Sequence, residues 1–351
     1  MRRGSGQPGR VVLHVGAPKS GTTYLQSRLH RNAVALAVHG VLVPRADAAD
    51  GPASLAFRAA LDLTGVRLGR GRGYTDGWWD RLVTVVGDHV ATGGTAVVSD
   101  EAFARADAAA VARAVADLRG TGAVLDVVYT ARDLARQLVS GWLEGLKHGG
   151  TRTFGAYLDA ARDGALKPMR AYDVASVLGR WTEALGDAGR VHLVTVPPEG
   201  GDRTLLWTRF LGVAGLDPAW APEEAARSND AVGLPEAQLL RALNERLGVA
   251  ASRGGRLHAV VQDVVRDALT DRGSPRVRLD PRHAGWVEER TSEWVAWARG
   301  SGVDVVGDLD DLRPAPVDPA TWEDPDRTVP AALDAADAAL AAVRAARRRR
   351  R

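Results

Sequence analysis

The sequence predicts an α/β protein with a central, mainly parallel sheet flanked by helices. Apolar runs rich in branched residues are typical of buried strands, and they occur at 11–16, 96–99, 124–130 and 191–196. Stretches of helical periodicity lie between these runs. Such alternation is typical of parallel strands that are connected through helices.

The helical stretches carry apolar residues three and four positions apart. They are predicted at 22–32, 102–119, 133–148, 173–185, 205–211, 234–246, 256–269 and 281–299. A closing segment at 303–312 contains a short strand, and a proline-rich linker and an alanine-rich helix follow it. We therefore expect one domain over 10–312 and a C-terminal extension over 313–351.

The segment between the first strand and the first helix has the composition of an anion-binding loop. It contains Gly16, Gly21 and Lys19, and it has three hydroxyl side chains within 20–23. Loop N–H groups and the positive end of a helix dipole attract anions, and the lysine adds a full charge. Only three of the 46 Lys and Arg residues are lysines, which favours a specific need for a compact ammonium here. The alternative is a glycine-dependent turn with a solvated lysine.

The loop departs from the phosphate-binding loop of nucleoside triphosphatases. Gly16 and Gly21 have the separation of that motif, but Thr22 stands where its lysine belongs. The lysine of this chain comes three residues earlier. The spacing therefore argues against an ATP-dependent phosphotransferase without excluding one.

A second candidate phosphate contact follows the strand predicted at 124–130. Arg132 stands at the end of this strand, and Ser140 lies eight residues later on the next predicted helix. Arginine offers a planar fork of donors to a phosphate, and serine adds one directed hydroxyl. The alternative is an exposed ion pair of Arg132 with Asp133 and an ordinary helix serine.

These two motifs, in this order, resemble those of the PAPS-dependent sulfotransferases of bacteria, where PAPS is 3′-phosphoadenosine-5′-phosphosulfate. The matching loop consists of Pro18, Lys19, Ser20, Gly21, Thr22 and Thr23. The resemblance implies a P-loop-NTPase-like sulfotransferase fold and PAPS as the cofactor, with no metal. It implies that Lys19 contacts the oxygen between phosphate and sulfuryl group, and that the following loop residues hold the 5′-phosphate. Arg132 and Ser140 would hold the 3′-phosphate.

The strand predicted at 96–99 supplies the preferred catalytic base, Glu101. In open α/β sheets the carboxyl ends of parallel strands meet at one edge, so we expect Glu101 to face the same crevice as Lys19. A carboxylate there could take the proton of an acceptor hydroxyl or amine. The segment Ser99-Asp100-Glu101 also resembles the Ser-x-Glu context of bacterial and carbohydrate sulfotransferases. The alternative is that Asp100 or Glu101 caps the next helix.

Histidine is the other candidate base, because some relatives in the resembled family use one. His14 lies in the first strand, where a core role is as compatible with the sequence. His148 follows the helix of Ser140, where it could reach an acceptor or interact with the helix C-terminus.

A late polar segment, 226–229, could complete the nucleotide site. It contains Arg227, and it resembles a loop that contacts the 3′-phosphate or adenine in bacterial sulfotransferases. The alternative is a helix cap, because Ser228 and Asn229 precede the helix predicted at 234–246.

Composition narrows the class of protein. The chain has no cysteine, which excludes disulfides and thiolate metal sites, and no cluster has metal-ligand spacing. The N-terminus lacks the apolar stretch of a signal peptide and no segment is long enough to span a membrane, so we expect a cytoplasmic protein. The formal net charge is +3, but five arginines end the chain, so the basic balance does not predict nucleic-acid binding.

The sequence therefore predicts sulfuryl transfer from PAPS to a hydroxyl or amine of a glycan, lipid or small metabolite. One alternative is an ATP- and magnesium-dependent P-loop phosphotransferase, in which Asp100 would hold the metal. Another is a non-catalytic nucleotide-binding module with an arginine-rich tail. The sequence determines neither the acceptor nor the oligomeric state.

Overall fold

The protein is represented by a computed structural model. It describes residues 8–45, 54–66, 76–202, 204–226, 232–247, 269–270 and 272–331. The chain forms two compact units. The first, here called the sheet unit, comprises Met1–Leu134, Lys167–Ala226 and Glu289–Arg313, and the second unit comprises Ala135–Leu166, Arg227–Glu288 and Pro314–Arg351.

The sheet unit contains one six-stranded sheet in which every neighbouring pair of strands is parallel. The strand order is β2-β3-β1-β4-β5-β6. The strands are β1 (Arg10–His14), β2 (Val41–Leu42), β3 (Thr95–Ser99), β4 (Val124–Ala131), β5 (Gly189–Thr195) and β6 (Asp304–Val306). The predicted α/β class and parallel sheet are confirmed. Strand β2 was not predicted, because two residues are too few to show a periodicity.

The centre of the sheet lies at β1, which pairs with β3 on one side and β4 on the other. His14 is in register with Ser99 and with Val128, so the carboxyl ends of the three strands meet. From β1 the chain crosses toward the β3 side, and from β4 it continues to the β5 side. The strand order therefore reverses between β1 and β4, and in open α/β sheets ligands bind at this point.

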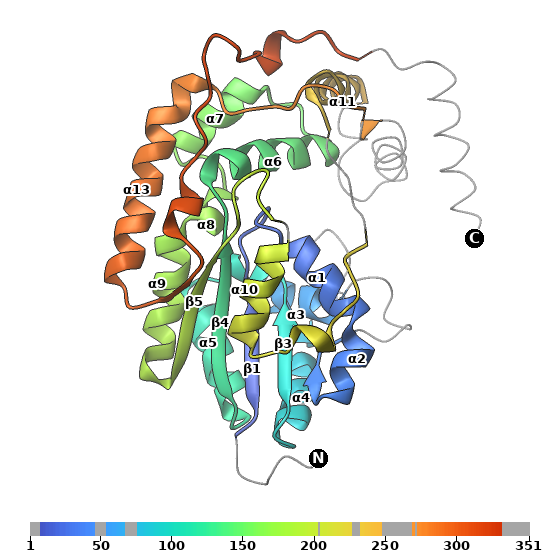
Figure 1. The fold of residues 1–351 in the computed structure, drawn as a ribbon, viewed down its shortest axis with the longest axis vertical. Coiled ribbons are helices and arrows are strands. Elements are labelled where there is room, and N and C mark those ends of the chain that lie inside the picture. The colour runs from blue at the N-terminus through green and yellow to red at the C-terminus, as the bar shows by residue number, and fades with distance from the viewer. Residues whose placement is uncertain are drawn as a thin grey trace, which may run out of the picture. The chain divides into compact units, whose positions relative to one another are not determined.

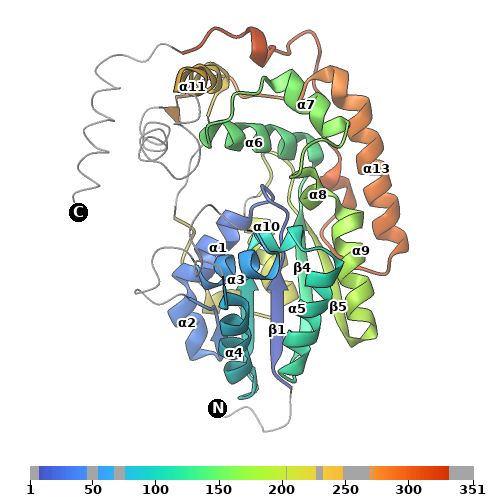
Figure 2. The same ribbon diagram turned by 180° about the vertical axis from the view of Figure 1, so that it is seen from behind.

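Helices cover both faces of the sheet. Side chains of β1, β3, β4 and β5, such as Val12 and Val128, form one apolar core with α1 (Thr22–Arg31), α2 (Ala33–Val38) and α10 (Thr204–Ala214) (Figure 1). The opposite face is covered by α4 (Trp78–Val90), α5 (Ala108–Gly120) and α9 (Val174–Leu185), which lie nearer the viewer in Figure 2. The strands are buried on both faces, which explains why they are nearly continuous apolar runs.

The remaining elements described include two short helices of the sheet unit, α3 and α8, and several 3₁₀ turns. They are α3 (Leu55–Leu63), α8 (Met169–Tyr172), η2 (Glu101–Arg105), η3 (Gly186–Ala188), η4 (Pro218–Trp220), η7 (Pro281–His283), η8 (Leu309–Leu312) and η9 (Pro325–Arg327). None of the helices in the described ranges is long and apolar enough to cross a membrane.

The helix predicted over 102–119 is two elements, η2 and α5. Asp100 accepts the backbone N–H of Ala102 at 2.9 Å, and Asp107 accepts that of Ala110 at 2.9 Å. Each carboxylate satisfies an N–H group that has no partner within its own helix. The second cap starts a new helix and interrupts the apolar pattern that predicted one.

The second unit is held together by side chains that bind helix ends. It contains most of α6 (Leu134–Lys147), α7 (Phe154–Arg162) and α11 (Leu234–Leu247), and the first turns of α13 (Ala284–Gly300). Asn244 of α11 donates to the carbonyl oxygens of Leu146 and Gly150 at 2.7 and 2.8 Å.

The predicted linker contributes to the second unit. Asp326 accepts the backbone N–H groups of Phe154 and Gly155 at 2.7 and 2.8 Å and so caps α7. The predicted helix at 331–347 and most of that at 256–269 lie outside the described residues.

Candidate anion-binding site

The loop after β1 contains a tight turn with Lys19 in an unusual backbone conformation. The N–H of Ser20 donates to the carbonyl of Ala17 at 3.2 Å, Pro18 occupies the second position, and Lys19 has a φ of 67°. This is the pattern of a type II turn, in which the third position favours glycine. Among the described residues, Lys19 is the only non-glycine residue with positive φ. Such strain costs on the order of 1–3 kcal/mol and is typical of functional sites.

Glycine is needed on both sides of this turn. Gly16 has a φ of 48°, and a Cβ there would lie 2.5 Å from Cγ2 of Thr22. Gly21 has a φ of 84°, and a Cβ there would lie 2.4 Å from Cδ2 of Leu206. A side chain is unfavourable at both positions, because the positive φ strains any L-residue and the added Cβ would displace the methyl group of Thr22 or Leu206. The two glycines therefore allow the loop to fold back tightly onto α1 and α10.

The start of α1 is open to an anion. Gly21 is its N-cap and provides no side-chain oxygen, and the first turn contains no acidic residue. The N–H groups of the first turn have no acceptor within the helix, and they carry the positive end of the helix dipole. Thr22 is buried and Thr23 is exposed at this end.

The loop is anchored to the end of β4, where Arg132 lies. The N–H of Val15 donates to Val128 at 2.8 Å, and the N–H of Ala17 donates to Thr130 at 3.0 Å. The Arg132 guanidinium donates to the carbonyl oxygen of Lys19 at 3.3 Å. The structure thus brings the two cations that the sequence singled out, 113 residues apart, to one place.

Glu101 lies directly beside the loop. It is the first residue of η2, at the carboxyl end of β3, and its carboxylate accepts a hydrogen bond from the hydroxyl of Thr22. The expected placement of Glu101 next to the loop of Lys19 is confirmed. Its role as a base stays a prediction.

Asp100, the neighbour of Glu101, is the N-cap of η2, so the predicted alternative of a helix cap is confirmed for Asp100. Its side chain is buried, and one oxygen accepts the Ala102 N–H. Burial is the largest cause of a raised pKa, which is about 7 for Asp100. The hydrogen bond from Ala102 lowers this pKa, and the nearby Glu101 raises it. No signal in the sequence reveals this, because the burial depends on elements distant along the chain.

His14 is fully buried in β1, next to the loop. Its Nδ1 lies 2.7 Å from Oγ of Ser99, and its Nε2 lies 3.2 Å from Oγ1 of Thr130. Burial lowers the pKa of His14 to about 3, so the ring is neutral. Of the two alternatives for His14, the core role fits the structure.

The other candidates belong to the second unit or fall outside the described residues. Ser140 is in the middle of α6 and His148 follows that helix, with its Nε2 3.0 Å from Glu144; both belong to the second unit. Arg227 lies outside the described residues. Within the described ranges, no group of three or more His, Asp or Glu side chains is arranged to hold a metal ion.

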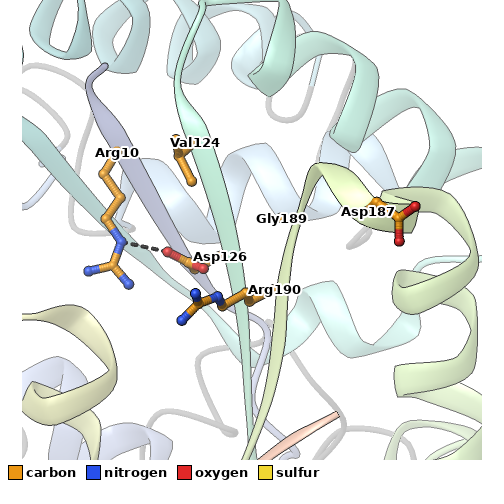
Figure 3. A pocket seen from close by; sticks show the side chains of 6 residues that line it. All are labelled: Arg10, Val124, Asp126, Asp187, Gly189 and Arg190. Atoms are coloured by element: carbon orange, nitrogen blue, oxygen red, sulfur yellow. Dashed lines mark hydrogen bonds and ion pairs between the residues drawn. The ribbon is translucent and has the colours of Figure 1, made fainter. Parts of the chain in front are cut away.

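A cavity of about 400 Å³ lies at the opposite, amino end of the strands (Figure 3). Its lining includes Arg10 and Asp126, which form an ion pair. The Arg10 guanidinium also donates to the carbonyls of Val213 and Ala214 at 2.7 and 2.8 Å, and Asp126 lies 3.4 Å from His192. These groups satisfy one another, so we interpret this cavity as a structural junction rather than a ligand site.

The carboxyl edge at β1, β3 and β4 therefore presents a strained lysine, an arginine, an open helix N-terminus and a carboxylate. This set can bind a phosphorylated or sulfated group and place a proton acceptor beside it. No family model matches the chain, and searches of curated proteins and of solved structures found no match either.

Proposed function

We propose that this protein is a sulfotransferase that moves a sulfuryl group from PAPS to a hydroxyl or amine of an acceptor. The fold that we propose is correspondingly the P-loop-like sulfotransferase fold. The observation that carries the proposal is the strained turn that holds Lys19 beside Arg132, where the strand order reverses. The resemblance of the loop and of the Arg132 motif to PAPS-dependent sulfotransferases supports the same reaction.

Some residues of the loop are assigned to binding PAPS, and others stabilise the conformation of the loop. The hydroxyl of Thr23 and the open N–H groups at the start of α1, that of Thr22 included, are assigned to the 5′-phosphate, because the Thr22 hydroxyl donates to Glu101. Lys19 is assigned to the oxygen that leaves with the phosphate. The hydroxyl of Ser20 is buried and bonded to Ala17 and Thr130. We therefore assign Ser20 to supporting the loop from within. Arg132 is assigned to the 3′-phosphate, and the roles that the resemblance implies for Ser140 and Arg227 stay predictions.

The chemistry requires one bond to form and one to break at sulfur. The acceptor oxygen or nitrogen bonds to sulfur while the bond from sulfur to the bridging oxygen breaks, and its electron pair leaves with the phosphate. Lys19 stabilises the charge that develops on that oxygen. Glu101 takes the proton that the acceptor loses. The acceptor could be a glycan, a lipid or a small metabolite.

The ATP-dependent alternative fits the geometry less well. Lys19 lies in a turn before the helix, and Thr22 occupies the first helical position, where the triphosphatase motif requires lysine. Asp100 would have to bind magnesium as a carboxylate, but its burial favours the protonated form.

Calorimetric titration separates the candidates. We expect PAP, the 3′,5′-diphosphate product of PAPS, to bind tightly without a metal, and ATP to bind weakly with or without magnesium. Binding of ATP with magnesium but not of PAP would overturn the proposal. PAP binding without any sulfated product across an acceptor panel would favour the binding module.

The matched variants for this titration are Lys19→Ala and Lys167→Ala. Both remove one lysine, but Lys167 is exposed and lies outside the loop. We expect only Lys19→Ala to weaken the binding of PAPS. Comparison of metabolites by mass spectrometry, with and without the enzyme, would then identify the acceptor by the added mass of one sulfuryl group.

A further inference from the structure

A chain of buried side chains leads from the end of β3 to the turn of the anion loop. Ser99 Oγ lies 2.7 Å from His14 Nδ1, and His14 Nε2 lies 3.2 Å from Thr130 Oγ1. Thr130 Oγ1 lies 2.6 Å from Ser20 Oγ, and Ser20 Oγ lies 2.6 Å from the carbonyl oxygen of Ala17. His14, Thr130 and Ser20 are each fully buried, so water does not compete for these bonds.

The donor and acceptor of each hydrogen bond in this series follow from its last member, the carbonyl of Ala17. The carbonyl of Ala17 can only accept, so the single hydroxyl hydrogen of Ser20 belongs to it. The contact of Ser20 with Thr130 then requires the hydrogen of Thr130. Thr130 has no second hydrogen, so His14 Nε2 must donate to it.

The state of His14 is thereby determined. Its ring is neutral because burial holds the pKa near 3, and a neutral ring has one donor and one acceptor. With Nε2 as the donor, Nδ1 accepts the hydrogen of Ser99. In the opposite tautomer, Nε2 would accept the hydrogen of Thr130. Ser20 Oγ lies 2.6 Å from both Thr130 Oγ1 and the Ala17 carbonyl oxygen, and one of these two contacts would then have no hydrogen between its oxygens.

We propose that His14 is a positioning residue of the loop, acting as its Nε2–H tautomer through Thr130 and Ser20. The Ser20 hydroxyl adds a second bond to the Ala17 carbonyl, within the turn that the Ser20 N–H closes and at whose third position Lys19 adopts positive φ. This conformation is intrinsically unfavourable for lysine, so it persists only where the surroundings hold it. The identity of the ligand that Lys19 would contact rests on the proposed function. The series of hydrogen bonds from Ser99 to Ala17 does not.

The first test measures the tautomer of His14 directly. Nitrogen-15 NMR of the full-length protein with labelled histidine distinguishes the two tautomers and the protonated ring. The His14 signal is identified as the one lost in His14→Asn. We expect the Nε2–H tautomer at neutral pH, in the wild type and in Thr130→Ser. The Nδ1–H tautomer, or a protonated ring, would overturn the proposal.

The second test measures the consequence for binding. Thr130→Val keeps the shape of the side chain and removes its hydroxyl, so we expect PAP to bind about fivefold or more weakly, as for one lost hydrogen bond. Thr130→Ser restores the hydroxyl and should bind within about twofold of the wild type. An unchanged affinity in folded Thr130→Val would refute the positioning role.

Thr195→Val is the matched control for general destabilisation. Thr195 is also buried, lies next to Ala131 in the register of β4 and β5, and bonds Asp311 rather than the loop. We expect it to lose stability without losing PAP affinity. If Thr130→Val does not fold, the tautomer in the wild type and in Thr130→Ser decides the proposal. If the wild type binds no PAP, the proposed function fails, and the NMR result still decides whether the hydrogen bonds run from His14 through Thr130 to Ser20 as proposed.

Discussion

Lys19 carries a positive charge at a position where its backbone conformation is unfavourable. The third position of a type II turn favours glycine, which reaches positive φ without steric cost, whereas lysine does not. The proposed role of its ammonium group would explain why lysine rather than glycine occupies this position. Strain and charge at one residue allow stability and activity to be separated by experiment.

Substituting Lys19 should cost activity but not stability. We expect Lys19→Gly to change the free energy of unfolding by less than about 1 kcal/mol, because relief of strain offsets the greater freedom of unfolded glycine. Sulfuryl transfer should fall by on the order of 100-fold or more, because the leaving group loses its charge partner. Urea unfolding and product formation from PAPS measure the two effects. A loss in the free energy of unfolding as large as the rise in the activation free energy of sulfuryl transfer would contradict this interpretation.

Glu101 should affect turnover rather than donor binding. Glu101→Gln keeps an oxygen that can accept the Thr22 hydroxyl, but it cannot take a proton. We expect turnover to fall by about 100-fold or more, with the affinity for PAP changed by less than about threefold. Steady-state kinetics and calorimetry on the same preparation provide both numbers. Full turnover in Glu101→Gln would exclude Glu101 as the base.

Asp100 should make stability depend on pH. Its pKa is raised from 3.8 to about 7 in the folded protein, so between these values the folded state binds more protons than the unfolded state. Stability should therefore fall as pH rises from about 4 to about 7, by a few kcal/mol at most, since each pKa unit corresponds to about 1.4 kcal/mol. Asp100→Asn keeps an oxygen for the Ala102 N–H and should remove this slope. Urea unfolding across that pH range in both proteins tests it.

At the scale of elements, the predicted strand bounds follow from local patterns, and a cap divides one predicted helix. Five helices of the described ranges were not predicted at all: α2, α3, α4, α7 and α8. The strands predicted at 124–130 and 191–196 differ from β4 and β5 by at most two residues at an end. Asp107 divides the helix predicted at 102–119, because a good cap begins a helix even within a continuous apolar pattern. Strand β2 becomes a strand only by pairing with β3.

The cap of α7 provides a prediction at this scale. Asp326 binds the N–H groups of Phe154 and Gly155 from a segment 172 residues later. We expect Asp326→Ala to destabilise the second unit by about 1–2 kcal/mol, and Asp326→Asn by less. Hydrogen exchange should increase in α7 and stay unchanged in β1 and β4. Equal increases in both units would show that the units do not respond separately.

At the scale of the whole molecule, the two ends of the sheet have different tasks. At the amino end, side-chain hydrogen bonds join the strands: Arg10 of β1 bonds Asp126 of β4, and Asp126 bonds His192 of β5. Burial raises the pKa of Asp126, but the hydrogen bonds from His192 and Arg10 outweigh this and lower it overall. The carboxyl end carries the anion loop. The hydrogen bonds of Asp126 and the proposed anion-binding loop thus lie at opposite edges of the sheet.

Removing the charge of Asp126 should therefore reduce stability alone. We expect Asp126→Asn to lower the free energy of unfolding by about 3 kcal/mol, because Arg10 and His192 lose a buried partner. The affinity for PAP should stay within about twofold of wild type at a temperature where the variant is folded. Thermal unfolding and calorimetry measure the two quantities, and a large loss of affinity would show that the edges are coupled.

The sequence by itself determined the parallel α/β class, the loop with Lys19 and the candidate phosphate contact of Arg132, because periodicity, glycine spacing and strand ends are local properties. Only the tertiary structure decided that Thr22 bonds Glu101, that burial raises the pKa of Asp100, and that His14 supports the loop through Thr130. These features join residues about 80 to 116 positions apart or depend on burial. Packing of distant strands creates them, and no local pattern encodes them.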